Sequence, residues 1–316
     1  MINESLDAYS IVLVYSAIGV YALAFLIFAF DLVKAPQREL RATNSGSQTL
    51  GAAAGGGVTT LTRPKAGAKN RTFRRPLLRV GFALTVLAWI LHVTATVMRG
   101  VAAGRVPWAN MYEFALTGVV MIVGVFIFSI FWRDLRFLGV YITGLAVIFL
   151  GLGAVNFYVA PIPLPPALQS IWIVIHVFVA VLGTGFFGVG AGISILQLIR
   201  DRSAKSRFVS QLPNTVTLED LAYRLNVIGF IMWTFTLIAG AIWAQAAWGR
   251  YWGWDTKEVW TFIIWVIYAG YIHARATRGW RGTRSAWLSL VGFAALIFNF
   301  TVVNLFFKGL HAYSGL

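Results

Sequence analysis

Eight long apolar runs, separated by shorter polar segments, dominate the pattern of the chain. Each run has about the 20 residues that an α-helix needs to cross the hydrocarbon core of a bilayer. The pattern therefore predicts an all-α, polytopic membrane protein with about eight transmembrane helices. The expected bounds of these helices are 9–31, 77–99, 111–132, 137–158, 171–199, 224–247, 258–274 and 286–307.

One polar segment is far longer than the others. Residues 34–76 contain scattered Ser, Thr, Lys and Arg together with the run Gly51-Ala-Ala-Ala-Gly-Gly-Gly57. Since such a composition cannot bury a core, it predicts a flexible, basic, cytoplasmic linker. The chain is thereby divided into a first transmembrane helix within residues 1–33, the linker at 34–76, and a seven-helix domain at 77–316.

Composition supports a membrane location and excludes some chemistry. Hydrophobic residues make up 59% of the chain and charged residues only 12%, whereas about a quarter of the residues of a soluble domain are charged. The chain contains no Cys. It therefore forms no disulfide and supplies neither a thiol nucleophile nor a thiolate metal ligand. Any thiol chemistry has to come from a partner.

The basic residues predict how the helices are oriented in the membrane. The net charge is +15, and Lys and Arg cluster in alternate loops, with ten in residues 34–79, five in 200–224 and four in 275–284. Because cytoplasmic loops carry an excess of Lys and Arg, both termini are expected on the extracytoplasmic side. Membrane orientation accounts for the charge, so nucleic acid is not expected as a partner.

The most unusual segment is the loop Trp248-Gly-Arg-Tyr-Trp-Gly-Trp-Asp-Thr-Lys-Glu258, which this topology puts on the extracytoplasmic side. Its four aromatic rings and two glycines suit a flat, largely apolar ligand that lies close to the backbone. An interfacial belt of Trp and Tyr is the structural alternative, but a belt spreads over many helix ends. Asp255 and Glu258 have the spacing of a capping box, which favours a structural role for both residues at the start of the next helix.

Two cations add positive charge near the same surface. Arg250 and Lys257 are candidates to pair with carboxylates such as the propionates of haem. Cations that extend from an apolar surface toward water are also common at this level of a membrane protein. An interfacial role is therefore the alternative for both.

Two of the four histidines are expected beside this loop. His176 lies near the outer end of its helix, and His311 follows the last helix on the same side. His273 lies roughly 22 Å deeper, since a helix rises about 1.5 Å per residue, and His92 lies inside the second helix. Because neutral imidazole is a standard axial ligand of haem iron, His176 and His311 beside the tryptophans favour a bis-histidine haem site. The alternative, an interhelical hydrogen bond, is the expected role of His92.

The tryptophan loop is similar to the signature of the haem-handling (WWD) proteins of cytochrome c maturation. Several branches share this signature, and the surrounding segments resemble the CcsA (ResC) type of the two-component System II pathway. The resemblance covers the second to the eighth predicted helix. The segments are Pro107-Trp-Ala-Asn-Met-Tyr-Glu113, Pro166-Ala-Leu-Gln-Ser-Ile-Trp-Ile-Val-Ile-His-Val177, Tyr271-Ile-His-Ala-Arg275 and Phe306-Phe-Lys-Gly-Leu-His-Ala-Tyr-Ser314.

The resemblance implies a set of residues that hold haem b as a bound substrate. His176 and His311 match the external histidines that ligate the iron, and His273 matches a histidine within the membrane that holds haem in transit. No residue of the chain is assigned a catalytic role of its own. The loop residues expected to hold the porphyrin are Trp248, Gly249, Tyr251, Trp252, Gly253, Trp254 and Asp255.

The same resemblance implies a subunit of a cytochrome c-type haem lyase, a multi-pass protein of the bacterial cytoplasmic membrane. It would bind haem at the outer face and present it for thioether attachment to the Cys-x-x-Cys-His motif of apocytochrome c. It would also take part in haem export. The implied partners are a CcsB (ResB)-type subunit, apocytochrome c and haem, and a thiol-reducing, thioredoxin-like protein is a further candidate. Since the apocytochrome brings both thiols, the lack of Cys agrees with this division.

Three alternative functions differ from this one in testable ways. A haem exporter or chaperone would carry the same signature but would form no thioether bond. A membrane cytochrome b-like electron-transfer subunit would pair its histidines within the bilayer, whereas here the two best candidates are at the outer surface. A secondary transporter would favour Asp, Glu or Lys along an intramembrane pathway, and the predicted helix interiors contain almost none.

Overall fold

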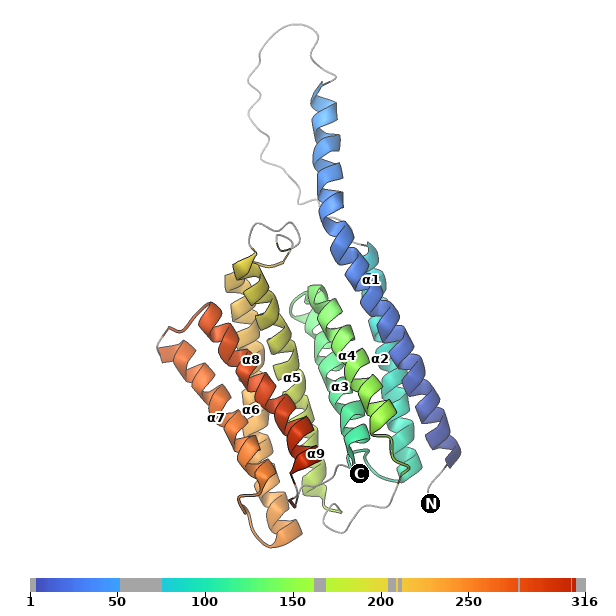
Figure 1. The fold of residues 1–316 in the computed structure, drawn as a ribbon, viewed down its shortest axis with the longest axis vertical. Coiled ribbons are helices and arrows are strands. Elements are labelled where there is room, and N and C mark those ends of the chain that lie inside the picture. The colour runs from blue at the N-terminus through green and yellow to red at the C-terminus, as the bar shows by residue number, and fades with distance from the viewer. Residues whose placement is uncertain are drawn as a thin grey trace.

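A computed structural model describes residues 4–51, 76–161, 169–203, 209, 212–277, 279–307 and 309–310 of the chain, the side chains of 35–51 excepted. These residues form a bundle of long helices that run up and down along a common direction (Figure 1). The described part of the chain contains no strand. The all-α fold class predicted from the apolar runs is confirmed.

Eight long helices make up the bundle, and their order follows the predicted one. They are α1 (Glu4–Gly51), α2 (Pro76–Ala103), α3 (Met111–Phe128), α4 (Gly139–Asn156), α5 (Ile171–Arg202), α6 (Thr215–Trp248), α7 (Thr256–Thr277) and α8 (Thr283–Phe298). Two short 3₁₀ turns lie between α3 and α4, at Ser129–Phe131 and Arg136–Leu138. After α8 the chain continues through a π-helix, η5 (Asn299–Val303), into the short α9 (Asn304–Phe306).

Seven of these helices are long and apolar enough to cross a membrane, counted over the described residues. They are α1 to α6 and the helix formed by α8 with its extension to Phe306. The predicted span at 258–274 also forms a helix, α7, which packs against α6 and α8. It is less apolar than the others because Trp and Tyr interrupt its apolar residues and His273 and Arg275 lie near its end.

The first helix is longer than the apolar pattern predicts. Instead of ending near residue 31, α1 continues to Gly51 and thus includes the first part of the segment expected to be a linker. Helix propensity favours only the first part of this extension, since residues 37–42 are Gln, Arg, Glu, Leu, Arg and Ala, whereas residues 43–51 are mostly Thr, Asn, Ser and Gly. Residues 52–75 lie outside the described ranges, so the flexible linker remains a prediction for them. Along its membrane part, α1 packs against α2 and α4.

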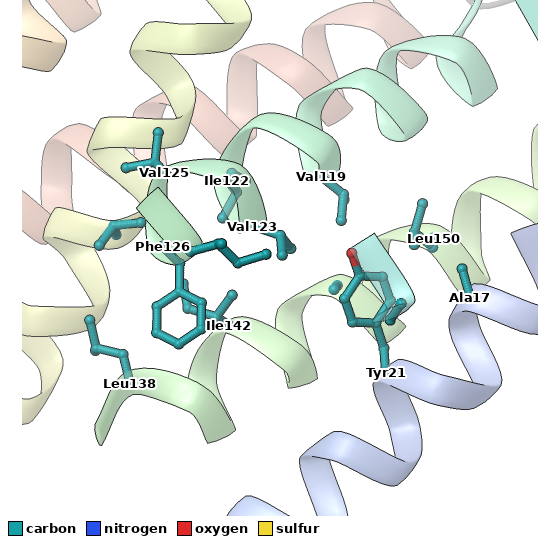
Figure 2. Packing of buried hydrophobic residues seen from close by; sticks show 14 of the residues in the cluster. Ala17, Tyr21, Val119, Ile122, Val123, Val125, Phe126, Leu138, Ile142 and Leu150 are labelled. Atoms are coloured by element: carbon teal, nitrogen blue, oxygen red, sulfur yellow. The ribbon is translucent and has the colours of Figure 1, made fainter. Parts of the chain in front are cut away.

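Two groups of buried apolar side chains hold the bundle together. The larger group joins α1 to α4 with parts of α5 and α6, and Val119, Ile122, Val123 and Phe126 of α3 lie at its centre (Figure 2). The second group belongs to α5 to α8, where the ring of Phe187 stacks on Tyr268 with 3.6 Å between ring centroids. Contacts between α3 and α5 connect the two groups. The space described next lies at this junction.

The start of α1, the junctions α2–α3 and α6–α7, the end of α4, the start of α5 and α9 all lie at one end of the bundle (Figure 1). The ends of α3, α5 and α7 and the starts of α2, α4, α6 and α8, which flank the basic segments of the sequence, lie at the opposite end (Figure 1). This arrangement brings together the segments that the topology assigned to the extracytoplasmic side. Which end faces the outside of the cell remains a prediction from the charge distribution.

Candidate ligand-binding site

A large, open cavity lies among α3, α5, α6, α7 and α8, at the end of the bundle where the tryptophan loop is found. It encloses about 1450 Å³ of empty space, counting the part that is open to the outside. Most of the lining is apolar, and its aromatic side chains include Trp108, Phe114, Trp233, Trp243, Tyr251 and Trp252.

Of the histidines that the structure describes, His176, in the second turn of α5, is the one that lines the cavity. Its Nδ1 atom lies 2.9 Å from the backbone carbonyl oxygen of Thr236 on α6. Because a carbonyl can only accept, Nδ1 carries the hydrogen in this contact, which gives the tautomer with its lone pair on Nε2. Metal-ligating histidines commonly donate their other ring N–H to a carbonyl in this way. The geometry of His176 therefore fits a ligand of iron.

Two residues of α6 fix the plane of this imidazole. The His176 ring is nearly parallel to the indole of Trp243, at 22° and with 6.0 Å between centroids. On the same helix, a Cβ atom added to Gly240 would lie 2.7 Å from the ring, so only glycine leaves room for it. Trp243 in turn meets Trp248, the first residue of the loop, edge to face at 4.7 Å. The histidine and the loop thus belong to one packed aromatic group.

The tryptophan loop begins where α6 ends. Gly249 caps the helix in the left-handed conformation with φ of +71°, and its N–H donates to the carbonyl of Gln245 at 3.0 Å. Glycine suits this position because it carries no Cβ penalty there. Further along, Trp252 and Trp254 meet edge to face at 5.9 Å. Trp254 also has a positive φ, +58°, and 75% of its surface is exposed, so its indole faces outward.

Glu258 anchors the second half of the loop. Its Oε2 atom accepts hydrogen bonds from the backbone N–H groups of Gly253, at 2.8 Å, and Asp255, at 3.0 Å. The second of these is the contact that the capping-box pattern predicted for Glu258 at the start of α7. A close contact with the guanidinium of Arg250 leaves no room for a Cβ atom on Gly253. The loop is therefore held by the carboxylate of Glu258 and by the packing of Arg250 against Gly253.

Asp255 connects the loop to the end of the described chain. Its Oδ1 atom accepts a hydrogen bond from the backbone N–H of Leu310 at 3.1 Å. Gly309 packs against the same carboxylate so closely that a Cβ atom on it would collide. Leu310 is the residue before His311 in the sequence. This contact between the loop and the tail was not predicted, because it joins segments 55 residues apart.

The predicted site residues fall into four groups. His176, Tyr251 and Trp252 line the cavity. His273 lies exposed near the far end of α7, where the carbonyl oxygen of its backbone accepts from Thr277. His311 lies outside the described residues. The other loop residues surround the cavity residues without lining it themselves; they are Trp248, Gly249, Gly253, Trp254 and Asp255.

Several lining residues were not predicted as part of the site. Trp243 lies one helical turn before the loop, and its position relative to His176 depends on how α5 and α6 pack. Asn304 belongs to the segment that follows the π-helix, a feature that often marks functional sites. Trp108 had a signal in the sequence, since it belongs to the motif Pro107-Trp-Ala-Asn-Met-Tyr-Glu113.

A buried ionic network holds the loop that carries Trp108. Glu113 accepts from Arg99 at 3.0 Å, from Arg105 at 2.7 Å and from the backbone N–H of Ala109 at 2.8 Å. Arg99 is fully buried and also pairs with Asp7 of α1 at 2.6 Å. In addition, Asn110 caps α3 by accepting from the backbone of Glu113. The network therefore connects α1 to one wall of the cavity.

The fold and the cavity define an all-helical, multi-pass membrane protein with an aromatic site near one end of its helices. Among known proteins, the family model described as "Cytochrome C assembly protein" matches residues 77–311. The chain belongs to this family, and its relatives show that it is of the CcsA type, with a role in cytochrome c biogenesis. The resemblance inferred from the sequence motifs is thus confirmed.

Individual relatives support the same assignment. The "Cytochrome c biogenesis protein CcsA" of Guillardia theta is 32% identical over 264 residues, which cover 75% of this chain and 86% of the relative. The protein of the same description from Heterosigma akashiwo is 34% identical over 245 residues, covering 66% and 76%.

One solved structure, described as "Cytochrome c Heme Lyase CcmF", matches with a TM-score of 0.62 at 16% identity. The match covers 92% of this chain but spans only 46% of that protein. At this identity the likeness concerns the fold alone.

Proposed function

We propose that the chain binds haem b in this cavity, with His176 as an axial ligand of the iron, and presents it for covalent attachment to apocytochrome c. The observation that carries the proposal is the geometry of His176. Its ring lines an aromatic cavity and contacts a carbonyl through Nδ1, and Trp243 and Gly240 hold its plane. A single imidazole beside wide aromatic walls suits an iron already held by a porphyrin.

The second axial ligand is His311. The hydrogen bond between Asp255 and Leu310 supports this choice, because it ties the residue next to His311 to the tryptophan loop. Two imidazoles would fill the coordination shell of the iron and limit its reaction with oxygen before transfer. One of them would leave when the histidine of the apocytochrome motif binds the iron.

His273 serves a separate step. It is exposed near the opposite end of α7 and does not line the cavity. An exposed imidazole at that depth suits a haem that is shared with a CcsB-type partner subunit, which would supply the other ligand during export. In this proposal the chain lies in the bacterial cytoplasmic membrane, with the cavity on the extracytoplasmic side.

The attachment reaction needs no group from this chain to form a bond. The sulfur of an apocytochrome thiol bonds to a vinyl carbon of haem, and the thiol hydrogen ends on the neighbouring vinyl carbon, without net oxidation or reduction. What the chain contributes is position. Holding two reactants in the correct geometry lowers a barrier by roughly 7–11 kcal/mol in favourable cases.

The test is an absorption spectrum of the chain purified with its partner subunit, in the reduced state. We expect the signal of six-coordinate, bis-histidine haem, which is lost in the variant His176→Ala/His311→Ala. Holocytochrome formation should fail in the same variant and return in part with added imidazole. Wild-type spectrum and activity in the double variant would refute the proposed ligands.

The second candidate function is haem delivery without bond formation. The cavity alone favours it as much as it favours synthesis, because both need the same haem site. The two differ in product. If the purified complex, haem and a reduced apocytochrome peptide yield thioether-linked haem, detected by mass, the chain belongs to a synthase. A complex that releases haem without this product would establish the delivery function.

A further inference from the structure

A lysine reaches the cavity without a carboxylate beside it. Lys257, in the first turn of α7, lines the cavity and donates a hydrogen bond to Oδ1 of Asn304. Among the described residues, no Asp or Glu oxygen lies within ion-pair distance of its ammonium group. The charge of Asp255 acts on it only from farther away. A partly buried cation with a neutral partner is a costly arrangement unless a ligand supplies the counter-charge.

Asn304 holds this ammonium in a defined position. The amide nitrogen of Asn304 donates to the carbonyl of Phe300 at 2.8 Å and contacts the sulfur of Met111 at 3.2 Å. Because these partners fix the amide group, its oxygen faces Lys257. Asn304 directly follows the π-helix η5, so the widened turn determines where this oxygen lies. An ammonium group has three donors, and Asn304 accepts only one of them.

Other polar atoms of the cavity wall are buried and unpaired. Within the described residues, Oε1 of Glu258, Oδ1 of Asn299 and Nε1 of Trp108 have no hydrogen-bond partner, although all three residues line the cavity. Glu258 is 9% exposed and Asn299 5%. Buried polar groups are nearly always hydrogen-bonded, so unpaired ones in a cavity wall indicate a polar ligand group or water. Of the three, only the N–H of Trp108 can donate to a carboxylate, whereas the oxygens of Glu258 and Asn299 need a donor such as water. Glu258 is on α7 with Lys257, Asn299 is in the π-helix that precedes Asn304, and Trp108 is in the loop before α3.

We propose that Lys257, positioned by Asn304, binds a carboxylate of the substrate and makes the cavity selective for porphyrins with free propionates. The inference rests on the proposed haem site and adds the recognition of one edge of the ring. The propionates and vinyl groups of haem b lie at opposite edges. Binding a propionate at Lys257 therefore decides where the vinyl groups point, which is the orientation that thioether attachment requires.

The inference separates two cations that the sequence could not distinguish. Arg250 is exposed, its guanidinium lies over Gly253, and it does not line the cavity. Lys257 lines it. Only Lys257 is therefore expected to sense whether the substrate carries free carboxylates, and Arg250 provides a matched control.

The experiment compares haem with its dimethyl ester, which keeps the iron, the ring and the vinyl groups but removes both carboxylates. Both are titrated into the full chain with its partner subunit and followed by absorption. For wild type, we expect the Kd for haem to be at least about tenfold lower than the Kd for the ester. This ratio corresponds to a difference of about 1.4 kcal/mol in binding free energy. In Lys257→Gln, the ratio of the two Kd values should fall close to one, while the absorption signal of haem ligated by His176 stays intact. Arg250→Gln should keep the wild-type ratio.

The outcomes separate this inference from the function on which it rests. A wild-type protein that binds haem and its ester equally well overturns the inference, whether or not any variant folds. A folded Lys257→Gln that keeps the preference overturns it as well. If wild type binds no haem, or if the spectrum is unchanged in His176→Ala, the proposed haem site itself is refuted, and the inference with it.

Discussion

His176 and Gly240 approach each other so closely that a Cβ atom on Gly240 would lie 2.7 Å from the imidazole ring. Because Gly240 of α6 has no side chain, the imidazole of His176 on α5 can occupy the space beside it. Together with the hydrogen bond to Thr236 and the contact with Trp243, this close fit holds the ring at the cavity wall. A substitution at Gly240 therefore tests the ligand without altering the ligand itself.

Gly240→Ala should displace His176 and weaken haem binding. Since real Cβ atoms essentially never approach other atoms to 2.7 Å, the ring has to move and its nitrogen loses the aligned position. We expect the Kd for haem to rise at least about tenfold, which corresponds to a loss of about 1.4 kcal/mol in binding free energy. A haem titration followed by absorption measures this change. Gly270→Ala is the control, because Gly270 lies in α7 outside the cavity lining and a Cβ atom added to it would meet nothing within 4 Å. Equal losses in both variants would contradict the assignment.

The hydrogen bond between Asp255 and Leu310 gives a test of the second ligand. Asp255→Leu removes the acceptor and should free the tail that leads to His311, so that the bis-histidine spectrum is replaced by that of five-coordinate haem or of another sixth ligand. Asp255→Asn keeps an oxygen that accepts from the Leu310 N–H and should retain most of the signal. A wild-type spectrum for Asp255→Leu would show that the tail is held by other contacts.

Features that depend on residues close together in the sequence could be predicted, and features that depend on contacts between distant segments could not. The apolar runs predicted the order of all eight long helices, because spanning length and composition are local properties. The capping contact of Glu258 with Asp255 was predictable for the same reason, since three residues separate them. The continuation of α1 to Gly51 differs from the prediction, because the Ser, Thr and Gly of residues 43–51 are typical of a linker and not of a helix.

The cavity itself depends on packing between distant segments. The sequence indicated His176 and the tryptophan loop, but the contacts of His176 with Thr236 and Trp243 come from the register of α5 on α6. The position of Asn304 depends on a π-helix, which has no clear sequence signal. Residues such as these are found only when the helices are placed relative to one another.

Loss of Arg99 should destabilise the protein far more than loss of a surface cation. Arg99→Met leaves the buried carboxylates of Asp7 and Glu113 without their shared partner. Removing one member of a buried ion pair costs about 3–5 kcal/mol. The exposed pair of Arg136 and Asp134 contributes only about 0–1 kcal/mol, so Arg136→Gln is the control. The free energies of unfolding of both variants are measured by denaturant unfolding in detergent, followed by tryptophan fluorescence. Equal values for the two variants would contradict the role of the network.

The orientation predicted from the basic loops can be tested with single cysteines, because the chain has none of its own. Val106 is exposed in the loop before α3, and Arg133 is exposed beyond the other end of that helix. A single membrane-spanning helix separates them, so only one of the two positions can face the outside. We expect a membrane-impermeant maleimide to label Val106→Cys in intact cells and to label Arg133→Cys only after the cells are opened. The reverse pattern would put the aromatic cavity on the cytoplasmic side, where a secreted apocytochrome could not reach it.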